Sequence, residues 1–221
     1  MTRLLAAALL LLAACGGGGG DDDGDAATST TTSTTAASVE PIDWRDPAPV
    51  DVDGWHLESC DGDAPVVCVD RDGEPAGIVE MVEFPVDSFP ALEEPLAAGD
   101  EDAALDALAE SFVADLTEDR SLGCGDGYVV EGLPIEHVTT GDGPAVRYGL
   151  VGTTADGATA ERVVQYAAIR GETLVILLAA AYSAEGCIAT EGQEFSPDDL
   201  EAFEPTFDRL VLASPMPAPT I

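Results

Sequence analysis

The run TLVILLAAAY at residues 173–182 constrains the fold more than any other segment of the chain. A strand with one face in water alternates apolar and polar residues, whereas this run is apolar at successive positions. A membrane-spanning helix needs about 20 apolar residues, so the run is too short to be one. We therefore predict a central strand whose two faces are both covered by other parts of the protein.

Similar runs precede this strand, and short turn sequences separate them. The turns are Gly141-Asp142-Gly143, Asp156-Gly157 and Arg170-Gly171, which are typical of tight connections between antiparallel strands. The predicted strands are 128–140, with a break near Pro134, 144–153, 160–170 and 172–182. This succession indicates an antiparallel meander.

A β-hairpin is predicted upstream of the meander. Residues 54–60 and 66–72 are extended runs, and the turn-prone sequence DGDAP joins them. A third strand is predicted at Ile78–Phe84.

The clearest predicted helix covers residues 101–120. Its apolar stripe consists of Leu105, Leu108, Phe112 and Leu116. Acidic residues at its start suit the positive end of the helix dipole.

A closing helix begins in the sequence FSPDDLEAF. Ser196 is a candidate N-cap, Pro197 occupies the first helical position, and Asp199 completes a capping box. Phe195 stands where a hydrophobic staple is expected. We expect Pro205 to kink or restart this helix.

The segment 85–99 contains three prolines, and we predict an extended loop there. Phe89, Leu92 and Leu96 would then be exposed. Such an apolar area is more than a spacer needs, so we predict contact with a partner at this loop.

These elements predict one α+β domain, an antiparallel β-sheet (meander) packed with helices. The stretches VVQYAAIRGETLVILLAA and FEPTFDRLVLAS resemble a strand pair and the terminal helix of the PsbP-like fold, which includes lipoproteins of the LpqN type. The likeness covers residues 54–213 and implies a PsbP-like sandwich. It also implies a protein- or lipid-binding role, since that family is mostly non-enzymatic.

The N-terminus predicts export. Arg3 precedes an apolar run, Leu4–Ala14, which as a helix would rise only about 16 Å. A run of this length is typical of a signal peptide. Leu12-Ala13-Ala14-Cys15 resembles the lipobox of bacterial lipoproteins, which implies removal of residues 1–14 and lipidation of Cys15. The protein would then be anchored at the extracytoplasmic face of the bacterial cell membrane. An ordinary secretory signal with an accidental cysteine is the alternative.

Composition divides the remainder of the chain. Residues 15–41 combine the lipidated cysteine with a tether of Gly, Asp, Thr and Ser, a composition that cannot form a core. We predict the domain at 42–213 and a frayed, proline-rich tail at 214–221.

The charge argues against two classes of partner. The chain has 43 acidic residues and eight basic ones, all of them arginine. Nucleic acid and anionic lipid surfaces both need a basic footprint. A solvated acidic shell, a basic partner and divalent cations remain as explanations.

Four cysteines follow Cys15: Cys60, Cys68, Cys124 and Cys187. An even number in an exported domain predicts two disulfides, for which three pairings are possible. We predict Cys60–Cys68 and Cys124–Cys187, since the first two lie near the closed end of the predicted hairpin.

No catalytic motif accompanies the two histidines, His56 and His137. G-x-S-x-G, H-E-x-x-H and glycine-rich phosphate loops do not occur in the sequence. The acidic stretches 61–63 and 70–74 are the best calcium candidates, but Pro75 stands where an EF-hand needs glycine. We expect neither a metal nor a cofactor.

Together these observations predict a non-catalytic binding or interaction module on an envelope lipoprotein, with an envelope protein or a lipid as its partner. Two alternatives remain open. One is an envelope hydrolase whose site residues are distant in the sequence, and the other is a cation-dependent structural protein.

Overall fold

The computed structural model describes residues 39–60, 66–124, 126–183 and 194–217. The chain divides into Met1–Ser38 and Val39–Ile221, and the described residues all belong to the second unit. Cys15, the predicted signal peptide and most of the predicted tether therefore lie outside the described residues.

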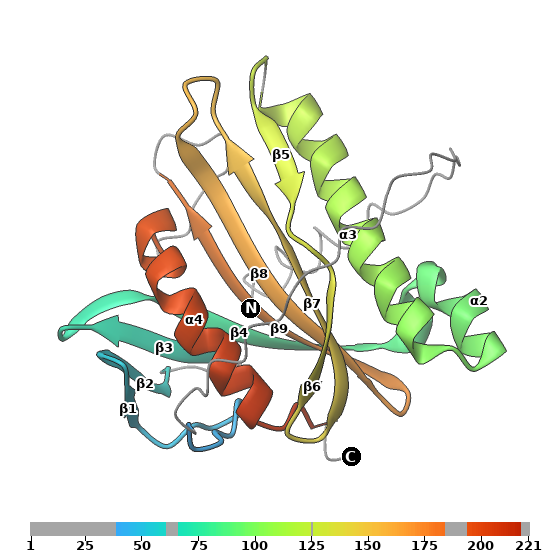
Figure 1. The fold of residues 1–221 in the computed structure, drawn as a ribbon, viewed down its shortest axis with the longest axis horizontal. Coiled ribbons are helices and arrows are strands. Elements are labelled where there is room, and N and C mark those ends of the chain that lie inside the picture. Colours follow the sequence, from blue (N-terminus) through green and yellow to red (C-terminus); the bar gives the residue numbers. More distant parts are fainter. Residues whose placement is uncertain (1–38, 61–65, 125, 184–193, 218–221) are drawn as a thin grey trace, which may run out of the picture. The chain divides into compact units, whose positions relative to one another are not determined.

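An antiparallel sheet forms the centre of the described domain (Figure 1). Its order is β1-β2-β3-β4-β9-β8-β7-β5, and β6 pairs with the same edge of β7 as β5. The strands are β1 (Val50–Val52), β2 (Trp55–Ser59), β3 (Val66–Arg71), β4 (Glu74–Pro85), β5 (Val129–Gly132), β6 (Glu136–Thr140), β7 (Gly143–Thr153), β8 (Thr159–Arg170) and β9 (Thr173–Tyr182). The predicted α+β class with an antiparallel sheet is confirmed.

The strand predicted to be central is β9, and its central place in the sheet is confirmed. It pairs with β4 on one side and with β8 on the other. Val175 and Leu177 point to one face of the sheet, Leu174 and Ile176 point to the other, and all four are buried.

The described residues form one 3-10 helix and three α-helices. They are η1 (Val86–Ser88), α2 (Pro90–Ala98), α3 (Glu101–Gly123) and α4 (Pro197–Ala213). The Asp100 side chain accepts a hydrogen bond from the Ala103 N–H, and the Ser196 hydroxyl accepts one from the Asp199 N–H. None of the described helices combines the length and apolarity that a membrane crossing requires.

The predicted restart of the closing helix does not occur, because α4 continues through Pro205. The proline removes one backbone donor from the helix. Phe203 before it and Phe207 after it are both fully buried. Burial of this apolar stripe outweighs the lost hydrogen bond.

The prediction of an extended loop at 85–99 is wrong. Pro90 stands in the first turn of α2, where the helix needs no backbone donor, and α2 packs against α3. Leu92 is fully buried by this packing, and the Phe89 ring packs edge-on against that of Phe84. Two of the three residues predicted to contact a partner are therefore part of the core.

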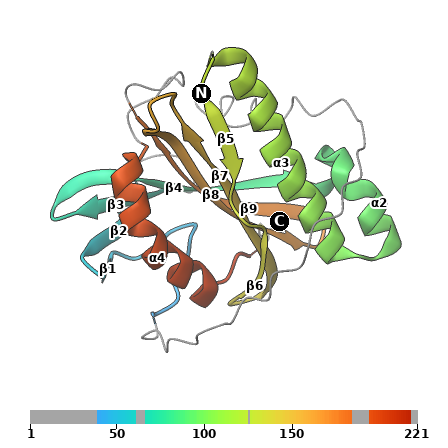
Figure 2. The ribbon, with the colours of Figure 1, turned by 45° about the horizontal axis from the view of Figure 1, so that its top comes forward.

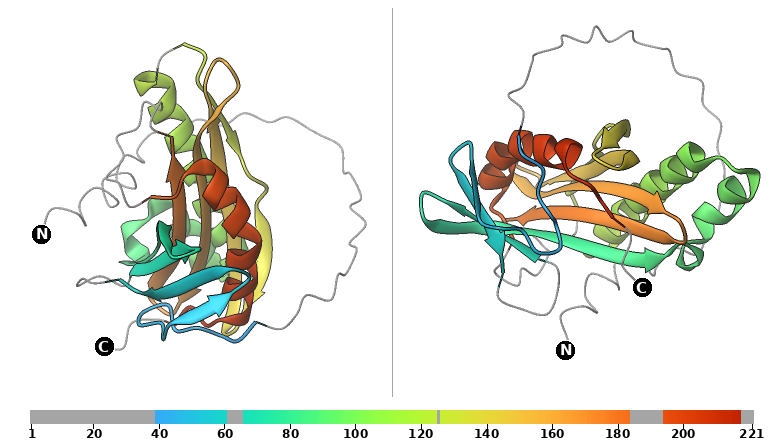
Figure 3. Two further views of the ribbon diagram at one scale, coloured as in Figure 1. Left: turned by 90° about the vertical axis from the view of Figure 1, so that its left-hand side faces the viewer. Right: turned by 90° about the horizontal axis from the view of Figure 1, so that it is seen from below.

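α4 and α3 lie on opposite faces of the sheet (Figure 3, left). The α4 side holds a continuous aromatic core in which Phe203 stacks between Phe195 and Phe207 and packs edge-on against Trp55. On the other side α3 packs on β5, β7 and β8. β1, β2 and β3 lie away from α2 and α3 in both views (Figures 1 and 2).

Ion pairs fasten α4 to the sheet beside its aromatic stripe. Glu204 on α4 accepts hydrogen bonds from Arg147 on β7 and from Arg162 on β8. Asp208, one turn later, accepts from Arg147 at 3.2 Å and from the Tyr166 hydroxyl at 2.6 Å. These contacts set the rotation of α4 against the strands.

Phe195 packs against a position where only glycine fits. Its backbone bonds to β9 through Ala180 and Tyr182, so it continues the sheet beside the end of that strand. A Cβ added at Gly77 would lie 2.4 Å from the Phe195 ring. The absence of a side chain at Gly77 thus makes room for part of the α4-side core.

The start and the end of the described domain are tied together. The Ile42 N–H donates to the Ser214 hydroxyl at 2.9 Å, and Arg45 donates to the Pro217 carbonyl at 2.8 Å. Ser214 and Met216 are fully buried. Residues 214–217 are thus packed against the domain, which corrects the prediction of a frayed tail for this part of it.

Asp142 adds a further contact to this end of the chain. It accepts hydrogen bonds from the Met216 N–H at 3.0 Å, from Thr140 at 2.9 Å and from Arg170 at 2.9 Å. Burial alone would raise the pKa of Asp142, but these hydrogen bonds outweigh burial and hold the pKa below its usual value.

Candidate binding face of the sheet

The face of the sheet opposite α4 is only partly covered by helices. Side chains alternate between the two faces along each strand, and α3 makes its main contacts with β5, β7 and β8. None of the described helices has its main contacts with β2, β3 or β4 on this side. We call this region the open face; it comprises His56, Glu58, Cys60, Val66, Cys68, Asp70, Ile78, Glu80, Leu178 and Ala180.

The strand registers place these side chains in rows across the sheet. Gln165 on β8 lies opposite Leu178 on β9, which lies opposite Glu80 on β4. Glu80 in turn lies opposite Val66 on β3. One row therefore runs from the strand beneath α3 to the β2–β3 hairpin.

The apolar side chains of the open face are neither exposed nor buried. Val66, Ile78, Leu178 and Ala180 are all half-buried. On the α4 side of the same strands, residues such as Val79 are fully buried. The apolar side chains of the open face are therefore more exposed to solvent than those on the α4 side of the same strands.

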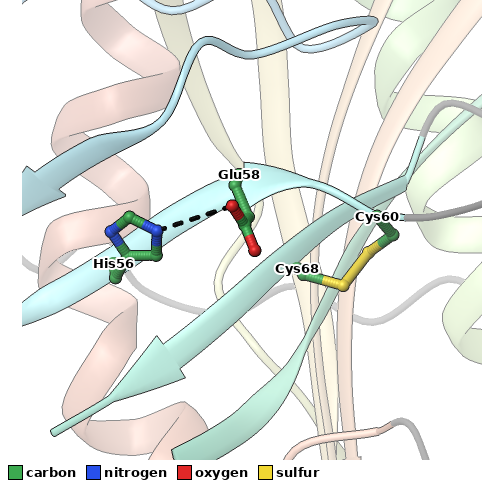
Figure 4. The surroundings of a disulfide bond; sticks show 4 residues. All are labelled: His56, Glu58, Cys60 and Cys68. Carbon is green, nitrogen blue, oxygen red and sulfur yellow. Dashed lines mark ion pairs between the residues drawn. A yellow bond between two sulfur atoms is a disulfide. The ribbon is translucent and has the colours of Figure 1, made fainter. Parts of the chain in front are cut away.

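A disulfide between Cys60 and Cys68 crosses the open face (Figure 4). The two Cα atoms are 5.1 Å apart. The Cys60 N–H donates to the Val66 carbonyl at 3.0 Å, so the disulfide joins the two strands diagonally. This pairing confirms the predicted short-loop disulfide.

The second predicted disulfide falls partly on residues that are not described. Cys124, at the end of α3, is disulfide-bonded. Cys187 lies outside the described residues. The pairing Cys124–Cys187 therefore stays a prediction.

His56 lies among carboxylates on the open face. The His56 Nδ1 atom is 2.8 Å from Asp51 on β1. The His56 Nε2 atom is 3.7 Å from Glu58, which lies on β2 with His56 (Figure 4). Asp70 on β3 lies opposite it in the register. The hydrogen bond with Asp51 is the largest cause of a raised His56 pKa; burial opposes it, and the charge of Glu58 adds to it.

His137 repeats this arrangement between β6 and α3. Its Nε2 is 2.9 Å from Asp106 and its Nδ1 is 3.7 Å from Asp102, one turn earlier on α3. In the described part of the chain, no group of three or more His, Cys, Asp or Glu residues is arranged to hold a metal ion.

Of the two acidic stretches considered as calcium sites, the structure describes only residues 70–74. Residues 61–63 lie outside the described residues. Residues 70–74 form the tight β3–β4 turn, in which Asp72 and Gly73 have positive φ angles of 54° and 80°. Arg71 of this turn lies over the Trp55 ring and pairs with Asp199 on α4. The turn thus contributes to packing on the α4 side.

Every arginine after Arg3 forms an ion pair within the domain. The pairs are Arg45–Glu83, Arg71–Asp199, Arg120–Glu161, Arg147–Glu204, Arg162–Glu204, Arg170–Asp142 and Arg209–Asp53. None of these arginines belongs to the open face. The basic groups are thus used inside the domain, and the excess charge at its surface is acidic.

The most deeply buried of these pairs joins Arg120 on α3 to Glu161 on β8. The guanidinium donates to both carboxylate oxygens, at 3.0 and 2.9 Å, and Glu161 is fully buried. The Tyr128 hydroxyl donates to the same carboxylate at 3.2 Å. Burial, and then the charge of Glu161, raise the pKa of Tyr128. This group holds α3 over β8.

Two polar groups beneath α3 are buried and have no hydrogen-bond partner. They are the Gln165 Oε1 atom and the Tyr148 hydroxyl, on residues that are 4% and 0% exposed and lie opposite each other on β8 and β7. The Phe112 ring of α3 packs edge-on against Tyr148. Gln165 is the outer member of the pair and borders the open face through Leu178. A buried acceptor without a partner costs about 1–3 kcal/mol, so Gln165 favours a donor from outside the described residues.

Two solved structures are similar to this chain at low sequence identity. Cyanobacterial PsbP (CyanoP) from Synechocystis sp. PCC 6803 is 12% identical, with a TM-score of 0.41, and the match covers 72% of this chain and 79% of that one. A protein of unknown function from Pseudomonas aeruginosa is 14% identical, with a TM-score of 0.32, and the match covers 75% of this chain and 99% of that one. No protein-family model and no curated protein sequence matches the chain.

Proposed function

We propose that this protein is a lipoprotein of the bacterial cell envelope whose domain binds a partner without catalysis, as do PsbP-like lipoproteins of the LpqN type. The observation that carries the proposal is the segment Leu12-Ala13-Ala14-Cys15, which ends an apolar run and precedes a tether unable to form a core. A diacylglyceryl group on Cys15 gives two acyl chains, and two chains anchor a protein stably where one does not.

Expression of the full chain in a bacterium tests the anchor. The wild-type protein should fractionate with membranes, and its first residue should be a Cys15 that carries acyl chains. Cys15→Ser should leave an unlipidated precursor or a released protein. Intact Met1–Ala14 in the mature, membrane-bound wild-type protein would contradict the proposal.

The histidine contacts support binding rather than catalysis. A triad needs a nucleophile hydrogen-bonded to a histidine, and the ring nitrogens of His56 and His137 contact carboxylates. The full chain should not turn over generic ester, peptide or glycoside substrates. Turnover that disappears in His56→Ala or His137→Ala would replace the binding function with an enzymatic one.

A further inference from the structure

The open face has the chemistry of a helix-binding surface. Val66, Ile78 and Leu178 are half-buried apolar residues that share this face on three neighbouring strands, and we call them the apolar centre. The carboxylate residue Glu80 lies between Val66 and Leu178 in the strand register. α3 covers the adjoining strands β7 and β8 with the apolar stripe of an amphipathic helix. A second helix beside α3 would complete the layer on this face.

The charges of the open face determine which charge the side chains of that helix should carry. Glu58 and Asp70 flank the apolar centre, and the nearest cation, His56, already faces Asp51 and Glu58. No arginine belongs to the face, since each is paired elsewhere in the domain. An incoming helix with lysine or arginine beside its apolar stripe is therefore complementary, and an acidic one is repelled.

The buried Gln165 Oε1 atom at the border of the open face gives an independent reason to expect basic side chains on the helix. The Gln165 Oε1 atom has no partner in a residue that is 4% exposed. Lysine and arginine side chains carry only donors, and their apolar stems can lie along apolar surface. One such side chain, reaching past Leu178, would supply the missing hydrogen bond.

We propose that the open face binds a cationic amphipathic helix of a partner protein, packed beside α3. This inference rests on the proposed binding function and assigns it a surface and a class of partner. The contact joins the apolar stripe of the helix to Val66, Ile78 and Leu178. Its basic residues pair with Glu58 and Asp70, and one of them reaches Gln165.

Binding of a defined peptide to the purified full chain tests the proposal. The probe is a fluorescently labelled peptide of lysine and leucine with its leucines at helical spacing, and fluorescence anisotropy reports the Kd. The double variant Glu58→Gln/Asp70→Asn should weaken binding about five- to tenfold. The matched control Glu110→Gln/Glu118→Gln removes two exposed carboxylates from α3 and should leave the Kd within about twofold.

Gln165→Met separates binding from folding. Replacing an unpartnered polar group by an apolar one of similar shape should leave thermal stability unchanged or higher. Peptide affinity should nevertheless fall about tenfold, because a hydrogen bond to a charged donor is lost. Unchanged affinity in this variant would overturn the proposal.

Other outcomes would also overturn the proposal. Equal weakening by the two double variants would mean general charge attraction, and tight binding of a peptide with glutamate in place of lysine would remove the charge argument. Sedimentation that shows a dimer of the chain without peptide, broken by Glu58→Gln/Asp70→Asn, would assign the face to a second copy. All these measurements use the purified chain, so they remain interpretable if Cys15 proves not to be lipidated.

Discussion

The two faces of the sheet are built from the same strands but are covered differently. On the α4 side, Phe195, Phe203 and Phe207 stack in a closed core, and ion pairs from Glu204 and Asp208 secure the helix above it. On the other side, α3 covers β7 and β8, while the apolar residues of β3, β4 and β9 remain half-buried. The α4 side is thus built for stability, and the open face leaves apolar area for contact.

The difference also appears in the polar groups. On the α4 side, Glu204 and Asp208 accept several hydrogen bonds each. Three buried polar groups of the described residues have no hydrogen-bond partner: the Trp44 Nε1 on the α4 side, and the Gln165 Oε1 and the Tyr148 hydroxyl beneath α3. A fold selected for stability alone would place an apolar residue at Gln165, so the unpartnered acceptor next to the open face fits a contact made there.

The largest expected effect appears when one apolar residue of each face is replaced by alanine. Phe203→Ala should lower the free energy of unfolding by about 4 kcal/mol, because a fully buried ring leaves a cavity between two stacked neighbours. Leu178→Ala should cost only about 1 kcal/mol, because its side chain is half-buried. Urea unfolding of the full chain measures both. Equal costs would show that the open face is as tightly packed as the α4 side.

The next effect concerns the helix-covered half of the second face. Arg120→Ala should cost about 3 kcal/mol, because it leaves the fully buried Glu161 without its counter-charge. The double variant Arg120→Met/Glu161→Leu should regain most of this stability, because no charge then remains buried. The same unfolding measurement applies. A double variant no more stable than Arg120→Ala would mean that the pair itself, rather than the unpaired charge, accounts for the loss.

The smallest effect lies at the rim of the open face. The pKa of His56 is raised above 6.5 in the folded protein, so its protonation stabilises the fold fully below pH 6.5, and this contribution is lost as pH rises through the folded pKa. His56→Asn should remove that part of the pH dependence and leave stability above the folded pKa nearly unchanged. Thermal unfolding of both proteins between pH 5.5 and 8 compares them, and NMR titration of His56 gives the pKa directly. A wild-type His56 pKa below 6.5 would contradict the assignment.

The regular elements could be predicted because their signals are local. The start of α3 follows from its acidic first turn, the cap of α4 follows from Ser196, and the central strand follows from its unbroken apolar run. The Cys60–Cys68 disulfide followed from its place near a hairpin end. Each of these features depends on residues close together in the sequence.

The errors came from long-range packing. The prolines of segment 85–99 indicated a loop, but burial of Leu92 against α3 stabilises a helix there, and only the tertiary contact reveals it. The open face was missed for the same reason, because its residues come from strands as distant as β2 and β9. One signal was available in the sequence, the polar Gln165 inside the apolar strand VVQYAAI.

The tie between Ile42 and Ser214 has a mechanical consequence. The chain enters the domain through a segment that is hydrogen-bonded to its last packed residues, and Arg45 extends that contact to Pro217. A pull on the chain before Ile42 would therefore load the closing segment of the domain before it reached the strands of the open face. The hydrogen bonds of Ile42 and Arg45 with Ser214 and Pro217 therefore lie where such a force would enter the domain.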